Sequence, residues 1–208
     1  TRNEPGLSYA QQWDVENRLA SVTGSGTATF VYDGDGNRVK ATLNGTTTAY
    51  VGNYYEWTNA AYKKYYYAGT QRVALNDNGT LYWLLGDHLG STALAANGTT
   101  GALISEQRYK PWDEKRYPDG ASILPTRHRF TGQIEENYIN LYQMGARCYS
   151  PVLGRWLSPD TLVPDLTNPQ SLNRFSYVRN NPLKYSDPSG HREIECDPGE
   201  AGCNANGQ

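Results

Sequence analysis

The sequence predicts an all-β fold built from many short strands joined by tight turns. Its 208 residues include 17 Tyr and 21 Gly, but only three Phe and one Met. Tyrosine favours half-buried strand surfaces, and glycine tolerates the positive φ of tight turns. Only Pro169 to Arg174 suggests a short helix. Strand-like runs recur about every 8–12 residues with turn residues between them, as at 18–23, 27–32, 38–43, 71–75 and 80–85.

Three Asn-Gly-Thr triplets, beginning at Asn44, Asn78 and Asn97, lie beside apolar or β-branched runs. Asn-Gly is the strongest short-range hairpin signal, because both residues tolerate the positive φ of a type I′ turn. We therefore expect a hairpin turn at each of the three triplets.

A weak repeat joins two segments near the start of the chain. The segments 13–19 (WDVENRL) and 32–39 (YDGDGNRV) both read aromatic-Asp, a short turn, Asn-Arg and an apolar strand start. We expect the Asp and Asn to hydrogen-bond the turn backbone while the aromatic ring packs on a neighbouring strand. The segment 65–73 resembles a degenerate third copy.

The composition changes after about Arg127, where prolines become frequent, at positions 151, 159, 164, 169, 182 and 188. Proline fixes φ and removes a backbone donor, so this part should be mostly irregular and extended. We place a boundary between Leu124 and Arg127. Residues 192–208 have almost no apolar side chains and should pack weakly. Because the chain starts at Thr1, we interpret it as a fragment or a processed product.

The charge balance gives no case for binding to nucleic acid or an anionic membrane. Nineteen Lys and Arg face 21 Asp and Glu, for a net charge of −2. No apolar run approaches the roughly 18 residues that span a bilayer, so we expect no membrane insertion by this segment. Cys196 and Cys203 either form a disulfide in an oxidising compartment or stay reduced, and Cys148 is expected to be a small buried hydrophobe.

Two further groups of residues imitate functional sites. The run 33–37 resembles the first half of a calcium loop, but its twelfth position is Asn44 and not Glu, which favours an ordinary turn. His88 follows Asp87, yet no Ser or Cys nucleophile pattern accompanies them, which favours a structural hydrogen bond. We expect neither a metal nor a cofactor.

The motifs that identify a family occur in a fixed order along the chain. They are GDHLGST at 86–92, QRYKPW at 107–112, RFTGQ at 129–133, GRWLSPD at 154–160, NRFSYV at 173–178, NNPL at 180–183 and DPSG at 187–190. Together with the aromatic-Asp repeat, this series resembles the Rhs/YD-repeat family, which includes teneurins and insecticidal toxin complexes. The resemblance covers residues 13–190.

The resemblance implies an architecture and partners. Residues 1–125 would be a YD-repeat segment of a hollow β shell, 126–190 the Rhs repeat-associated core domain that plugs one end, and 191–208 a short variable tail. The implied partners are the remainder of the shell and an encapsulated C-terminal toxin, or other copies of the chain. The implied location is secreted or on the cell surface.

The resemblance also implies, at most, one enzymatic activity, an autoproteolytic cut of the aspartyl-protease type just after the core domain. Matched residue by residue, the catalytic groups are Asp160, Asp187 and Arg147, and the cleavage site is His191 and Arg192. Two carboxylates within about 3–5 Å of each other share a proton, so one activates water while the other acts as an acid. Carboxylates more than about 8 Å apart would instead be turn formers.

The sequence departs from the family at this site. Cleaving members usually carry Asp-Pro-x-Gly-Leu or something close at both Asp positions, whereas here Thr161 follows Asp160 and His191 replaces the leucine. Two alternatives to a cleaving shell therefore remain open. One is a non-catalytic cell-surface or adhesive YD-repeat protein, and the other is a self-associating structural module.

Overall fold

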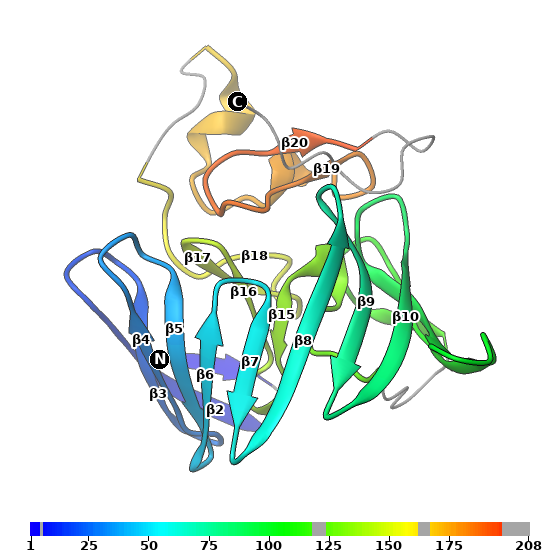
Figure 1. Cartoon of the computed structure of the whole chain (residues 1–208). Helices are drawn as coiled ribbons and strands as arrows, with labels where there is room; N and C mark the ends of the chain where they lie inside the picture. The colour runs from blue at the N-terminus through cyan, green and yellow to red at the C-terminus, as the bar shows by residue number, and fades with distance from the viewer. Residues whose placement is uncertain (5, 118–123, 162–166, 197–208) are drawn as a thin grey trace.

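The computed structural model describes residues 1–4, 6–117, 124–161 and 167–196, and it is dominated by antiparallel strands (Figure 1). One twelve-stranded sheet holds the first half of the chain, with its strands in sequence order. Its members are β1 (Arg2–Glu4), β2 (Leu7–Trp13), β3 (Leu19–Gly24), β4 (Ala28–Tyr32), β5 (Arg38–Leu43), β6 (Thr46–Val51), β7 (Tyr55–Thr58), β8 (Ala61–Ala68), β9 (Gln71–Asp77), β10 (Thr80–Gly86), β11 (Thr92–Asn97) and β12 (Leu103–Glu106). This confirms the predicted all-β fold.

Three smaller antiparallel sheets follow. They are β13 (Arg108–Tyr109) with β14 (Lys115–Tyr117); β15 (Ile134–Glu136), β16 (Leu141–Met144), β17 (Arg147–Ser150) and β18 (Arg155–Trp156); and β19 (Tyr185–Ser186) with β20 (Ile194–Glu195). Four 3-10 turns join them, at η1 (Phe130–Gly132), η2 (Asn137–Ile139), η3 (Pro169–Leu172) and η4 (Val178–Asn180). The predicted short helix is η3. The prediction of mostly irregular backbone after Arg127 is wrong for residues 134–156, which form the ladder β15–β18 and mostly precede Pro151. The described residues between this sheet and β19, 157–161 and 167–184, form turns and 3-10 segments and no strand.

Two of the three Asn-Gly turns form as predicted. Asn44 and Gly45 have φ of 44° and 83°, and Asn78 and Gly79 have φ of 49° and 92°, so each pair closes a two-residue hairpin. At Asn97 the chain does turn back, but through a longer loop in which Gly101 takes the positive φ. Gly98 serves a different need there, because a Cβ atom would lie 2.5 Å from Leu81 Cγ.

The aromatic-Asp repeat encodes one recurrent turn. At Asp14, Asp33 and Asp87, the Asp N–H donates to the carbonyl four residues later, and its Oδ1 accepts from the backbone N–H two and four residues later. This pattern confirms the predicted role of the Asp and corrects the prediction of the third copy. The hairpin at 68–71 is an ordinary two-residue turn, and the third copy is the turn at Asp87.

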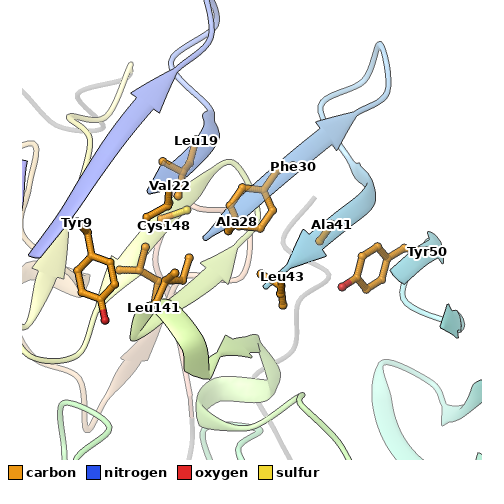
Figure 2. Close-up of a cluster of buried hydrophobic side chains, with 11 residues drawn as sticks. Tyr9, Leu19, Val22, Ala28, Phe30, Ala41, Leu43, Tyr50, Leu141 and Cys148 are labelled. Atoms are coloured by element: carbon orange, nitrogen blue, oxygen red, sulfur yellow. The ribbon is translucent and has the colours of Figure 1, made fainter. Parts of the chain in front are cut away.

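The large sheet curves around β15–β18, as Figure 1 shows, and buries its concave face against them. We call the large sheet the shell segment and residues 126–190 the core segment. Inward side chains of β2–β6 form one cluster with Ile139, Leu141 and Cys148 of the core segment. Figure 2 shows Leu141 and Cys148 among the sheet residues Val22 and Ala28. Cys148 is 4% exposed and free, as expected for a small buried hydrophobe. The core segment is therefore packed inside the curve of the shell segment.

Part of the tail is better packed than its composition predicts. Ile194 and Glu195 form β20 against β19, the Cys196 N–H donates to the Lys184 carbonyl, and Cys196 is disulfide-bonded. Its expected partner, Cys203, lies outside the described residues, as does the rest of the tail. No helix in the described part of the chain is long and apolar enough to cross a membrane.

Candidate functional site

The three predicted catalytic side chains meet at one guanidinium group. Arg147 Nη2 lies 2.9 Å from Asp160 Oδ2 and 3.2 Å from Asp187 Oδ2. Arg147 is on β17, Asp160 follows β18 and Asp187 follows β19. Because both carboxylate oxygens lie this near one nitrogen, the two carboxyl groups are closer together than the distance of about 8 Å beyond which they would be separate turn formers. The separation of about 3–5 Å for a shared proton stays a prediction. The structure thus brings the three residues together.

Asp187 closes the loop that holds the predicted cleavage site. Its Oδ1 accepts hydrogen bonds from the backbone N–H groups of Gly190 at 2.9 Å and of His191 and Arg192 at 3.1 Å. The Asp187 residue is only 4% exposed. Burial raises its pKa above the usual range, although Arg147 and these donors oppose the rise. A raised pKa favours the protonated form that an acid catalyst requires.

Two glycines set the position of this loop. A Cβ on Gly145, in the β16–β17 turn, would lie 2.1 Å from the Ser189 carbonyl oxygen. A Cβ on Gly190, whose φ is 76°, would lie 2.5 Å from the Met144 carbonyl oxygen. The Ala146 N–H donates to the Ser189 carbonyl at 3.0 Å. Because neither glycine carries a side chain, the Asp187 loop lies directly on the hairpin that leads into Arg147.

Asp160 is held from two sides. Its N–H donates to the Arg174 carbonyl at 3.0 Å, and the Arg174 guanidinium donates back to the Asp160 carbonyl. Its side chain is 8% exposed, and its Oδ1 lies 2.9 Å from His191 Nδ1. Sequence reasoning assigned no role to Arg174 and placed His191 only at the cleavage site. The NRFSYV motif was the available signal for Arg174, whereas the His191 contact had none.

Arg147 is fixed by more than its carboxylate partners. Its Nε donates to the Gly190 carbonyl, and its Nη1 donates to the Arg174 carbonyl at 3.2 Å. Its guanidinium carbon lies 4.0 Å from the Trp156 ring centroid, a cation–π distance. Burial lowers the pKa of the guanidinium, and the two carboxylates oppose that effect. The group is therefore a pre-oriented cation rather than a mobile surface arginine.

A cluster of aromatic side chains packs next to the site, because the ring of Trp156 lies against Arg147. The cluster gives several of the sequence motifs a common structural role. Tyr177 is fully buried and lies 5.4 Å from Trp156 and 4.7 Å from Tyr149, centroid to centroid. Phe130 and Trp112 pack on the same cluster. The motifs QRYKPW, RFTGQ, GRWLSPD and NRFSYV each contribute at least one ring to this cluster, so these four motifs share one packing unit.

A cavity of about 650 Å³ lies between the large sheet and the core segment. Its wall includes Tyr50 and Arg72 from the sheet and Ser189 and His191 from the Asp187 loop. Arg147, Asp160 and Asp187 line a separate, smaller pocket, and His191 lines both.

The two lesser groups of residues have structural roles. The Asp33 carboxylate is bonded to its own turn, and among the described residues no cluster of three or more His, Cys, Asp and Glu side chains is placed to hold a metal. His88 Nε2 lies 3.1 Å from the Leu183 carbonyl oxygen. This contact ties the GDHLGST segment to the NNPL segment.

The strand meander, the recurrent aspartate turns and the enclosed core segment define a shell protein of the Rhs/YD-repeat class. The Teneurin YD-shell family model matches residues 49–183, and the chain belongs to that family. It is 28% identical over 197 residues to the tRNA3(Ser)-specific nuclease WapA of Bacillus spizizenii, covering 88% of this chain and 8% of that protein. It is 36% identical over 111 residues to toxin subunit YenC1 of Yersinia entomophaga, covering 49% and 10%.

Solved structures share the fold. A Tc holotoxin pore of Photorhabdus luminescens matches with a TM-score of 0.70 and 22% identity, over 93% of this chain and 10% of that one. The crystal structure of TcdB2-TccC3 matches with a TM-score of 0.69 and 23% identity, over 88% and 10%. The chain thus spans a small fraction of the length of the proteins it resembles.

Proposed function

We propose that this chain is the C-terminal part of a secreted or cell-surface shell that encloses a toxin segment and cuts its own backbone between His191 and Arg192. In this proposal residues 1–125 form shell wall, 126–190 form the core domain, and 191–208 form the tail, of which the part from Arg192 on begins the released segment. The observation that carries it is the Arg147 guanidinium, which binds Asp160, Asp187 and the Gly190 carbonyl next to the proposed scissile bond.

The proposed reaction is hydrolysis by two carboxyl groups. Asp160 takes a proton from a water molecule, whose oxygen attacks the carbonyl carbon of His191. Asp187 gives its proton to the nitrogen of Arg192 as the C–N bond breaks. The Arg192 N–H donates to Asp187 Oδ1 at 3.1 Å, so the carboxyl group lies beside the leaving nitrogen, and the transfer requires it to turn its own proton toward that nitrogen. The products are a carboxylate at His191 and an amine at Arg192.

The charges around the site suit this division of labour. Arg147 Nη2 lies 2.9 Å from Asp160 Oδ2 and so places a positive charge beside the proposed base. Burial raises the pKa of Asp187, which favours the protonated form that an acid requires. Groups with opposite protonation states at one pH are the general arrangement of acid–base pairs.

Packaging is supported by the position of the site beside the hollow. Ser189 and His191 form part of the wall of the cavity of about 650 Å³, so the residue on the N-terminal side of the proposed cut faces this cavity. This is the point at which a cut would release an enclosed segment inside the shell.

The proposal is tested with Asp160→Asn and Asp187→Asn in the chain expressed with its natural flanking sequence. Asparagine keeps the shape and removes the acid–base chemistry, so both variants should stay uncut while the parent is cleaved. Asp35→Asn, in an exposed turn of the shell segment, is the matched control and should be cut like the parent. Cleavage of either site variant at the parental rate, with unchanged circular dichroism, would refute the proposal.

A second candidate is a non-catalytic shell that adheres to a surface or to itself. Tyr66, Trp83 and Leu103 lie in one row across β8–β12, in register through two alanines. They are 46%, 45% and 60% exposed, which is typical of a contact surface rather than a core. An uncut parent whose sedimentation shows self-association, abolished by Trp83→Ser, would favour this candidate.

A further inference from the structure

His191 differs from the other residues of the site because its side chain contacts the proposed base. Its Nδ1 lies 2.9 Å from Asp160 Oδ1, and its side chain is 34% exposed against 8% for Asp160. Its own N–H donates to Asp187 Oδ1 at 3.1 Å. The residue on the N-terminal side of the proposed scissile bond therefore contacts both carboxylates, one through its ring and one through its backbone.

With this contact, both carboxylate oxygens of Asp160, the proposed base, have a bound partner. Asp160 Oδ2 is bound by Arg147 Nη2 at 2.9 Å, and Oδ1 by His191 Nδ1 at 2.9 Å. A carboxylate accepts hydrogen bonds but does not donate them, so His191 Nδ1 must carry the proton of this pair. While both oxygens of Asp160 are bound to these donors, they are less available to accept a proton from water.

We propose that His191 is a positioning residue that restrains self-cleavage by holding Asp160, and that the bond between His191 and Arg192 is cut when the imidazole leaves the carboxylate. This inference rests on the proposed function and adds a control to it. The partly exposed ring can move toward solvent without unpacking the core, because the contact is a side-chain contact at the rim of the cavity.

The charged groups around the ring are Asp160, Asp187 and Arg147 at the site, Arg174 behind Asp160, and the Arg179–Glu193 ion pair on the neighbouring segment. The restraint follows from the contact between His191 Nδ1 and Asp160 Oδ1, so removing the imidazole should release it.

The test compares cleavage rates of the parent, His191→Leu and His191→Asn under the same conditions. Leucine cannot hold the carboxylate, so this variant should be cut about tenfold faster than the parent, the effect of losing one charge-assisted hydrogen bond. Asparagine places an N–H donor at the same position, so its rate should stay close to that of the parent.

A second readout does not require cleavage. In an uncut Asp187→Asn chain above neutral pH, the nitrogen-15 shifts of His191 should show the proton on Nδ1, and Asp160→Asn should remove that preference. Equal rates for the parent and His191→Leu would overturn the restraint while leaving the proposed cleavage intact. Loss of cleavage in His191→Leu alone would also overturn it, because the histidine would then assist the reaction. Absence of cutting in all three chains would overturn the proposed function with it.

Discussion

The buried ion pair between Arg38 and Glu136 should be the strongest single polar link between the shell segment and the core segment. Arg38 Nη1 on β5 lies 2.6 Å from Glu136 Oε1 on β15, with side-chain exposures of 5% and 2%. The Arg38 guanidinium lies over the Tyr50 ring at 4.8 Å. Arg127 Nη1 contacts the other Glu136 oxygen at 3.2 Å. One carboxylate thus contacts two guanidinium groups, one through each of its oxygens.

Glu136→Gln removes that charge and leaves Arg38 buried without an anion. Breaking a buried pair in this way costs about 3–5 kcal/mol, a large part of the total stability of a typical domain. Arg38→Met should cost less, because Glu136 keeps Arg127. The double variant Arg38→Met with Glu136→Leu should recover more than half of the loss, since apolar groups of similar size replace buried pairs well.

The measurement is urea unfolding followed by tryptophan fluorescence, with the free energy of unfolding obtained from the midpoint and an unchanged slope. Glu16→Gln, in an exposed turn of the shell segment, is the matched control, and it should change the free energy of unfolding by less than about 0.5 kcal/mol. A loss below about 1 kcal/mol for Glu136→Gln, or a double variant less stable than that single one, would refute the reasoning.

Three further predictions follow from buried groups and one glycine. Burial raises the pKa of Asp113 well above its usual value. The contribution of Asp113 to stability is therefore complete at low pH and is lost as the pH rises through the pKa of the folded state. In thermal melts, Asp113→Asn should become more stable than the parent as the pH rises. Burial would raise the pKa of Glu56, but hydrogen bonds from His128 and other donors lower it to about 2. The stability that Glu56 contributes should therefore be present above about pH 4.5 and lost as the pH falls toward 2. In the same thermal melts, Glu56→Gln should remove that acid dependence. Gly145→Ala should lower the free energy of unfolding by at least about 1 kcal/mol and slow any cleavage, because its Cβ would displace Ser189.

The large sheet was predictable because its signals are local. Asn-Gly pairs and aromatic-Asp turns encode hairpins through the conformations of a few consecutive residues, and alternation assigns the faces of each strand. The Asn97 turn differed because Gly98 lies against Leu81, a contact that appears only once the sheet is formed. The pairing of β20 with β19 also depends on tertiary context that the polar composition of the tail does not reveal.

The candidate site was predictable in its residues but not in its geometry. The family motifs identified Asp160, Asp187 and Arg147, and spacing alone does not reveal that one nitrogen of Arg147 contacts both carboxylates. The contact of His191 Nδ1 with Asp160 Oδ1 joins residues 31 positions apart in the sequence. No periodic pattern predicts such a contact, because irregular backbone carries no repeating geometry.

The most direct test of the account is the intact mass of the chain expressed in its natural sequence context, combined with the N-terminal sequence of any released fragment. The account predicts two species in the parent, with the second beginning at Arg192, and a single uncut species in Asp187→Asn. A single uncut species in the parent at every pH, including in the His191→Leu variant, or a cut that persists in Asp187→Asn, would contradict self-cleavage by this site.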